Sequence, residues 1–175
     1  MTAAEAYEAI TGGGTTDFAD AVEVLNQYRP WCLIGGLAVN CYVEPVYTLD
    51  ADVVIVTERL PEIERALVER GFQIERFAHS LNARRGKGRL NLQFSTDSRY
   101  QEFLKNAAPA EVLGLRVPVA SLADLVRGKI WAWQDTQRRF SKRKKDELDL
   151  IRIGEAHPDM RSMLPTEIAS QLPER

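Results

Sequence analysis

The sequence predicts an α+β protein with an α/β-type mixed sheet and helices gathered toward its carboxyl end. Short apolar runs rich in β-branched residues alternate with segments of helical periodicity, which is typical of mixed sheets flanked by helices. Residues after 119 carry almost only helical patterning. We expect one domain over residues 1–175, with a sheet core and flanking helices over 17–118 and a helical carboxyl-terminal part over 119–175.

The amino-terminal half alternates helices with two buried strands. Phe18, Val22 and Leu25 recur at helical spacing, and Pro61 and Gly71 stand near the start and just past the end of another helix. The segment TLDADVVIV is rich in β-branched residues and favours a strand. The expected elements are helices over 3–10 and 17–28, a strand over 31–36, a short helix over 37–43, a strand over 48–56 and a helix over 60–71.

The second half contains a predicted hairpin followed by two longer helices. Gly86 and Gly88 join two strand-like runs in a hairpin turn. Ser121 and Asp124 have the spacing of a helix amino-terminal cap. The expected elements are strands over 72–79, 80–85 and 89–95, a short extended piece over 115–120, helices over 122–139 and 142–154, and a helix turn with a frayed end from residue 157 onward.

Composition favours a cytoplasmic protein without a membrane span. Of the 175 residues, 45% are hydrophobic and 27% charged, and no uninterrupted apolar run approaches the length of a membrane helix. The amino-terminal stretch MTAAEAYEAITGGG has acidic residues and neither a basic start nor an apolar core, so we expect no secretory signal.

The charged residues are balanced overall but unevenly distributed. A net charge of −2 argues against a chain dedicated to binding nucleic acid. However, residues 84–89 and 138–145 together hold ten of the 23 Lys and Arg residues. These basic segments are either solvated loops or surfaces that face a phosphate-bearing ligand.

A glycine pair and two aspartates stand out in the stretch 33–56. Gly35 and Gly36 follow an apolar run where a strand passes into a helix, and free backbone N–H groups at such a point favour an anion. Asp50 and Asp52 are two residues apart on a strand, so they point to the same face. Such carboxylates repel each other unless solvent screens them or a cation lies between them, and oxygen ligands suit Mg²⁺ or Mn²⁺.

The segment IGGLAVNCYVEPVYTLDADVVI resembles the signature of the DNA polymerase beta-like nucleotidyltransferase superfamily. In that signature a strand, a Gly-Gly or Gly-Ser pair and a short helix precede Asp-x-Asp on the next strand. The carboxyl-terminal SLADLVRGKIWAW and RKKDELDLIRI are similar to the family's two following helices, so the resemblance covers residues 31–153. The resemblance is strongest to a bacterial group of small proteins that includes aminoglycoside nucleotidyltransferases and AbiEii-type toxin enzymes.

The resemblance implies a metal-dependent nucleotidyltransferase that moves a nucleoside monophosphate from a nucleoside triphosphate to an acceptor hydroxyl. Asp50 and Asp52 would hold Mg²⁺ or Mn²⁺, and Gly35 and Gly36 would approach the triphosphate. Thr48 would position the nucleotide nearby. The acceptor could be a small molecule, a tRNA or a protein, and the sequence leaves the nucleobase and the oligomeric state open.

Lys129 is a further candidate because it falls within the apolar stripe of its predicted helix. A buried ammonium needs an anionic partner or an aqueous cleft, so Lys129 either reaches a phosphate or site carboxylate or extends its charged end from the edge of the core. The resemblance implies that it pairs with Asp146 or Asp149 across helices.

Asn91 departs from the family pattern, because it stands where the resemblance places a third carboxylate. An amide oxygen can bind metal or nucleotide, but it adds no charge and accepts no proton. Three possibilities therefore stay open: an enzyme active without that carboxylate, a catalytically reduced fold that binds nucleotide or a macromolecular partner, or a different alignment of this strand. A toxin–antitoxin component that modifies tRNA or a partner protein is a further hypothesis, supported only by the basic segments.

Overall fold

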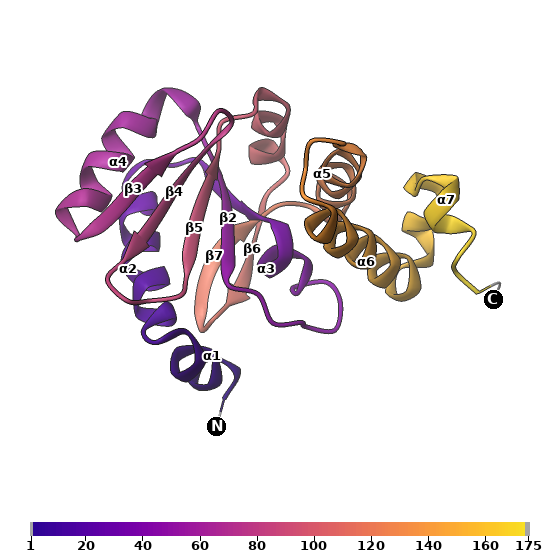
Figure 1. Ribbon diagram of the computed structural model, residues 1–175, viewed down its shortest axis with the longest axis horizontal. Coiled ribbons are helices and arrows are strands. Elements are labelled where there is room, and N and C mark those ends of the chain that lie inside the picture. Colours follow the sequence, from indigo (N-terminus) through magenta and orange to yellow (C-terminus); the bar gives the residue numbers. More distant parts are fainter. Residues whose placement is uncertain (1, 174–175) are drawn as a thin grey trace.

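A seven-stranded mixed sheet forms the centre of the computed structural model, which describes residues 2–173 (Figure 1). The strands lie in the order β3-β4-β5-β2-β1-β7-β6. Their bounds are β1 Trp31–Ile34, β2 Asp50–Ile55, β3 Phe72–Arg76, β4 Ser80–Arg85, β5 Asn91–Ser95, β6 Ala108–Val112 and β7 Leu115–Val119. The predicted α+β class with a mixed sheet is confirmed.

The strand that carries the two aspartates lies at the middle of the sheet. β2 pairs antiparallel with β1 and parallel with β5. In the parallel register Asp50 lies opposite Asn91, and Asp52 lies opposite Gln93. The pairing therefore sets two carboxylates beside two amides on adjacent strands.

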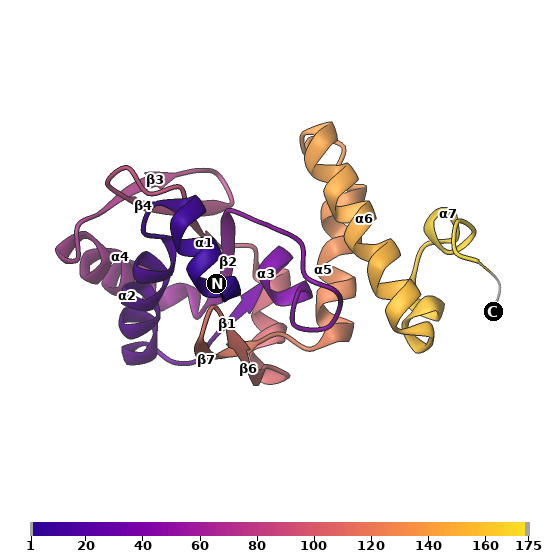
Figure 2. The ribbon, with the colours of Figure 1, turned by 90° about the horizontal axis from the view of Figure 1, so that it is seen from below.

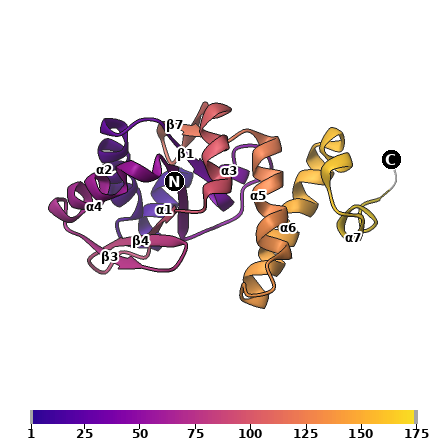
Figure 3. The ribbon, with the colours of Figure 1, turned by 90° about the horizontal axis from the view of Figure 1, so that it is seen from above.

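The helices cover the back of the sheet and one end of it. α2 and α4 pack together behind the sheet, whereas α5 and α6 stand side by side next to α3 (Figures 2 and 3). The helix bounds are α1 Ala3–Thr11, α2 Gly14–Gln27, α3 Gly35–Val39, α4 Leu60–Glu69, α5 Leu122–Gln134, α6 Phe140–Ala156 and α7 Thr166–Ala169, with 3-10 helices η1 Thr57–Arg59, η2 Ser98–Lys105 and η3 Pro158–Met163.

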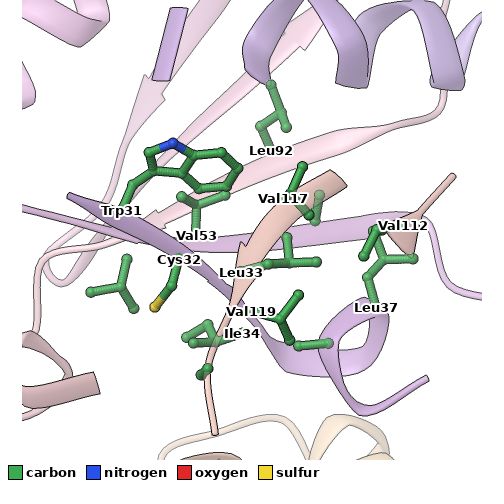
Figure 4. Close-up of a cluster of buried hydrophobic side chains, with 14 of the residues drawn as sticks. Trp31, Cys32, Leu33, Ile34, Leu37, Val53, Leu92, Val112, Val117 and Val119 are labelled. Atoms are coloured by element: carbon green, nitrogen blue, oxygen red, sulfur yellow. The ribbon is translucent and has the colours of Figure 1, made fainter. Parts of the chain in front are cut away.

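The core includes the whole of β1, in which all four residues are buried. Figure 4 shows Trp31 and Leu33 from this strand among side chains of β2, β5 and β7, including Val53, Leu92 and Val119. A strand that is covered on both faces carries a continuous run of apolar residues rather than alternating apolar and polar residues. This buried strand leads directly into α3.

Several predicted bounds were wrong, and the largest error concerns the last two helices. α5 ends at Gln134 rather than at residue 139, because Asp135 accepts a hydrogen bond from the Gln137 backbone N–H at 2.9 Å and begins a turn. α6 then begins at Phe140 rather than at residue 142. The loop between them is therefore rich in exposed polar and basic residues.

The bounds near the glycine pair and in the hairpin also differ. The short helix expected over 37–43 is α3, which begins at Gly35, so both glycines belong to its first turn. The hairpin of β4 and β5 is confirmed, although β5 begins at Asn91 rather than at residue 89. β6 and η2 were not predicted, and the extended piece over 115–120 is β7, which pairs with β1 and β6.

Within residues 2–173, none of the helices combines the length and the apolar character needed to cross a bilayer.

Candidate active site

A cleft lies between the carboxylate-bearing centre of the sheet and the pair of helices α5 and α6. We call its two sides the cleft floor, formed by Gly35, Asp50, Asp52 and Gln93, and the helical wall, formed by α5, α6 and the loop that joins them. The wall contributes Lys129, Arg138, Lys142, Asp146 and Asp149. The cleft therefore joins residues that are more than a hundred positions apart in the sequence.

Gly35 and Asp52 are in direct contact at the cleft floor. Gly35 adopts a φ of +71°, in the left-handed region that disfavours side chains. A Cβ atom at this position would overlap the Asp52 carboxylate. The first glycine of the pair is therefore required both by its backbone conformation and by the carboxylate that lies against it.

Gly36 has looser surroundings than Gly35. A Cβ atom at Gly36 would lie 3.5 Å from the Thr48 side chain, an ordinary van der Waals distance. Thr48 is buried, and its hydroxyl accepts a hydrogen bond from the Asp50 backbone N–H at 3.3 Å. Thr48 thus fixes the start of β2 and lies beside the second glycine.

Asp52 is a partly buried carboxylate without a close partner. No hydrogen bond or ion pair reaches its oxygens from residues 2–173. Burial raises the pKa of Asp52 to about 6, and the nearby negative charge of Asp50 adds to this shift, against the opposing charges of Lys129, Arg138 and Lys142. The site therefore tolerates an unneutralised acid, which is typical of functional positions.

Asp50 points into the same cleft but is held by two neighbours. Its Oδ2 accepts a hydrogen bond from Lys142 Nζ at 2.8 Å, and its Oδ1 accepts one from Asn91 Nδ2 at 3.2 Å. Burial alone would raise the pKa of Asp50, but Lys142, Asn91 and the charge of Lys145 together lower it below its ordinary value. Asp50 is thus ionised, and Lys142 supplies a cation beside it.

The predicted shared face of the two aspartates is confirmed, since both line one part of the cleft together with Gln93. Asn91, in contrast, is buried and lies beside Asp50 on the adjacent strand. Its amide oxygen accepts a hydrogen bond from Arg84 Nε at 3.1 Å. Gln93 is the β5 amide that faces the cleft, and sequence reasoning did not single it out, although alternation along the strand places it on the same face as Asn91.

Lys129 is bound within the helical wall rather than left free toward the cleft floor. Its Nζ lies 2.9 Å from Asp146 Oδ1 and 2.7 Å from Asp149 Oδ2. Burial alone would lower the pKa of Lys129, but these two carboxylates raise it above its ordinary value. The pairing implied for Lys129 across the two helices is thus present with both aspartates.

Two arginines complete this buried ion network. Arg138 Nε lies 2.8 Å from Asp146 Oδ2, and Arg152 Nη1 lies 2.7 Å from Asp149 Oδ1. Arg152 also donates to the side chain of Asn40 and to the backbone carbonyl of Glu44. The network therefore links the helical wall to the loop between α3 and β2.

The oxygen-rich cleft floor suits a hard divalent cation. Asp50 and Asp52 supply carboxylate oxygens on one face, and the amide of Gln93 lies opposite Asp52. No cluster of three or more His, Cys, Asp or Glu side chains is arranged to hold a metal within residues 2–173. Two carboxylates nevertheless fit Mg²⁺, which commonly binds one or two of them together with substrate phosphates and water.

Solved structures share this arrangement of elements. The antibiotic-resistance factor ANT(2″)-Ia is 14% identical over 92% of this chain and 89% of its own, with a TM-score of 0.61. The lincosamide antibiotic adenylyltransferase LnuA is 10% identical over 77% of this chain and 94% of its own, with a TM-score of 0.53. An antigenic nucleotidyltransferase-like protein from Paracoccidioides brasiliensis is 16% identical over 94% of this chain and 96% of its own, with a TM-score of 0.53.

Comparison of the sequence with family models and with curated proteins finds no match. At 10–16% sequence identity, the likeness to the solved structures shows a shared fold and nothing finer. The chain therefore shares the α+β nucleotidyltransferase fold of these structures.

Proposed function

We propose that this protein is a metal-dependent nucleotidyltransferase that moves a nucleoside monophosphate from a nucleoside triphosphate to an acceptor hydroxyl. The observation that carries the proposal is the unpaired Asp52 carboxylate, which lies against Gly35 and beside Asp50 at the cleft floor. A carboxylate that has no close partner and whose pKa is raised by burial and by a neighbouring acid costs the fold stability unless a ligand uses it.

In the proposed reaction the acceptor oxygen attacks the α-phosphorus of the triphosphate. A new phosphorus–oxygen bond forms, the bond from the α-phosphorus to the bridging oxygen breaks, and pyrophosphate leaves. The hydroxyl proton passes to water in the open cleft. Charge neutralisation and positioning supply most of the catalysis in such displacements.

The chain's own residues have distinct tasks in this proposal. Asp50 and Asp52 would hold Mg²⁺ or Mn²⁺, which when bound neutralises phosphate charge. Gly35 and Gly36 would let the triphosphate approach the backbone of α3. Arg138 lines the cleft opposite the acids and would face the phosphates, while Lys129 would act indirectly by holding the helical wall together.

A transfer assay tests this proposal. The protein is incubated with Mg²⁺, each α-labelled triphosphate and a pool of RNA, protein and small hydroxyl-bearing antibiotics. We expect a labelled acceptor, loss of labelling with a chelator, and a fall of at least about 100-fold in Asp52→Asn. Asp159→Asn, at an exposed site on η3, is the matched control and should keep full activity.

A second candidate function is nucleotide binding without transfer. It is favoured by the amides of Asn91 and Gln93, which lie on β5 opposite the two aspartates and supply no third carboxylate. In that case triphosphate would bind in a metal-dependent way, but the wild-type protein would label no acceptor in the pool. Titration calorimetry with each triphosphate separates this outcome from a protein that does not bind nucleotide.

A further inference from the structure

We infer that Lys142 takes the place of the metal at Asp50 in the ligand-free protein, so that a divalent cation must displace its ammonium group before it can join the two acids. Lys142 then regulates the site of the proposed function, on which this inference rests. The ammonium group is a competitor of the metal that the chain itself supplies.

Lys142 reaches across the cleft from the helical wall to the cleft floor. It lies in the first turn of α6, and its Nζ is 2.8 Å from Asp50 Oδ2. Lys142, Asp50 and Asp52 line the same part of the cleft. The charge of Lys142 also opposes the rise in the pKa of Asp52, so one ammonium group partly offsets both acids. Lys142 therefore supplies, with a single charge, the neutralisation that a divalent cation supplies with two.

The two acids differ in how far they are open to a metal. Asp50 has a partner on each oxygen, Lys142 on Oδ2 and the Asn91 amide on Oδ1 at 3.2 Å. Asp52 receives no hydrogen bond or ion pair from the residues that the structure describes. Asn91 is buried on β5, so Lys142 is the partner that is free to leave. A cation shared by the two acids would thus take the place of Lys142 on Asp50 Oδ2.

The surroundings of Lys142 allow it to move, in contrast to those of Lys129. The Lys142 side chain is 42% exposed, and within residues 2–173 its ion pair is with Asp50 alone. Lys129 is 12% exposed and is held by both carboxylates of the helical wall. Ion pairs of partly exposed side chains stabilise proteins weakly, and the flexible stem of lysine lets its ammonium group swing to another anion. The Lys142–Asp50 pair can therefore compete with a metal without excluding it.

A triphosphate is the anion that the released ammonium group would meet. Arg138 and Lys145 line the same part of the cleft as Lys142, so phosphates bound there lie among cations. Once Lys142 leaves Asp50, its charge needs a new partner, and a phosphate oxygen supplies one. Metal and triphosphate should then bind cooperatively, because a coupling between two ligands is reciprocal. Metal alone should bind weakly to the ligand-free site.

Binding of Mn²⁺ to the intact protein, without nucleotide, tests the inference. Electron paramagnetic resonance measures the free ion as protein is added. We expect Lys142→Met to bind Mn²⁺ about five- to tenfold more tightly than the wild type, because the ion neither displaces an ammonium group nor is repelled by it. Lys142→Arg keeps the cation and should bind Mn²⁺ no more tightly than the wild type.

The matched control is Lys145→Met, which removes the same charge from the same helix. Lys145 lines the cleft and lowers the pKa of Asp50 through its charge, without a hydrogen bond to it. Its loss should change Mn²⁺ affinity by no more than about twofold, because solvent screens a charge that makes no contact. Equal gains in Lys142→Met and Lys145→Met would overturn the inference, since they would indicate a general effect of charge. The absence of any gain in Lys142→Met would also overturn it.

Inorganic tripolyphosphate gives a second readout, with the opposite sign. With Mg²⁺ in excess, we expect calorimetry to show that Lys142→Met binds tripolyphosphate at least about fivefold more weakly than the wild type, because the phosphates lose the ammonium group. Damage to the fold would weaken the binding of both ligands. Weaker binding of Mn²⁺ and of tripolyphosphate in Lys142→Met would therefore contradict the exchange of Lys142 between Asp50 and phosphate.

The variant Asp52→Asn separates this inference from the proposed function. We expect it to bind Mn²⁺ at least about tenfold more weakly than the wild type, because one of two carboxylate ligands is lost. If it does so while Lys142→Met has no effect, the acid pair is a metal site and only the inference fails. If Asp52→Asn leaves Mn²⁺ affinity unchanged, the ion binds elsewhere, and the metal dependence in the proposed function fails together with the inference.

Discussion

The cleft floor and the helical wall each carry two aspartates, but only the floor holds an aspartate that lacks a close partner. In the wall, Asp146 and Asp149 are buried, and each forms two ion pairs with Lys129, Arg138 or Arg152. On the floor, Asp52 has a raised pKa and no close partner among residues 2–173. Paired acids hold a structure together, whereas an acid without a close partner costs stability, and such acids are typical of functional positions.

The strongest way to test this comparison is to remove the cation shared by the wall. We expect Lys129→Met to lower the free energy of unfolding by about 3–5 kcal/mol, because it leaves two buried carboxylates each short of a partner. Chemical denaturation measures this change. Lys105→Met, which removes the exposed pair with Glu102, should alter stability by less than about 1 kcal/mol. Normal stability with lost transfer would instead place Lys129 among the reacting groups.

Removal of the Asp52 charge on the cleft floor is expected to raise stability. Asp52→Asn should stabilise the metal-free protein by about 3 kcal/mol at pH 7, because it removes a partly buried charge with a folded-state pKa of about 6. The folded protein retains the Asp52 proton more strongly than the unfolded chain does. The loss of stability that ionised Asp52 causes in the wild-type protein is therefore absent below about pH 4. It grows as the pH rises toward 6 and is complete above that pH. A gain in stability that does not vary with pH would contradict this origin.

Replacing the glycine that supports Asp52 should have a smaller effect. Gly35→Ala is expected to cost about 2 kcal/mol of stability, since the methyl group overlaps the carboxylate and the φ of +71° is strained for alanine. Gly36→Ala should cost less than about 1 kcal/mol, because its Cβ would make ordinary contacts. Thermal unfolding of both variants compares the two positions, and equal losses would show that Asp52 does not enforce glycine.

The smallest effect on stability is expected for Lys142, which joins the wall to Asp50 on the floor. Lys142 is 42% exposed, so Lys142→Met should change stability by less than about 1 kcal/mol. The pKa of Asp50 should rise in this variant, because the Lys142 hydrogen bond and charge lower it in the wild-type protein. Carboxyl NMR titration measures that shift. An unchanged Asp50 pKa would show that the two side chains do not pair in solution.

Local patterns were sufficient to predict much of the fold and part of the site. β-branched runs and helical periodicity located β1, β2, α2 and α4, because these features act within a few residues. The alternation of side chains along a strand was enough to predict that Asp50 and Asp52 lie on one face. The errors lie where side chains override local preference, as at Asp135, which ends α5 five residues early by turning the backbone.

Amino-acid order alone puts two carboxylates on one strand face after a glycine pair and gathers basic residues in two segments. Which charges meet depends on the folded chain, because pairing follows from the packing of β2 against β5 and of α6 against the sheet. The folded chain pairs Lys129 with Asp146 and Asp149, sets Asn91 beside Asp50, and closes the cleft over Gln93. Distances between residues a hundred positions apart follow from the whole fold, and no local pattern in the chain contains them.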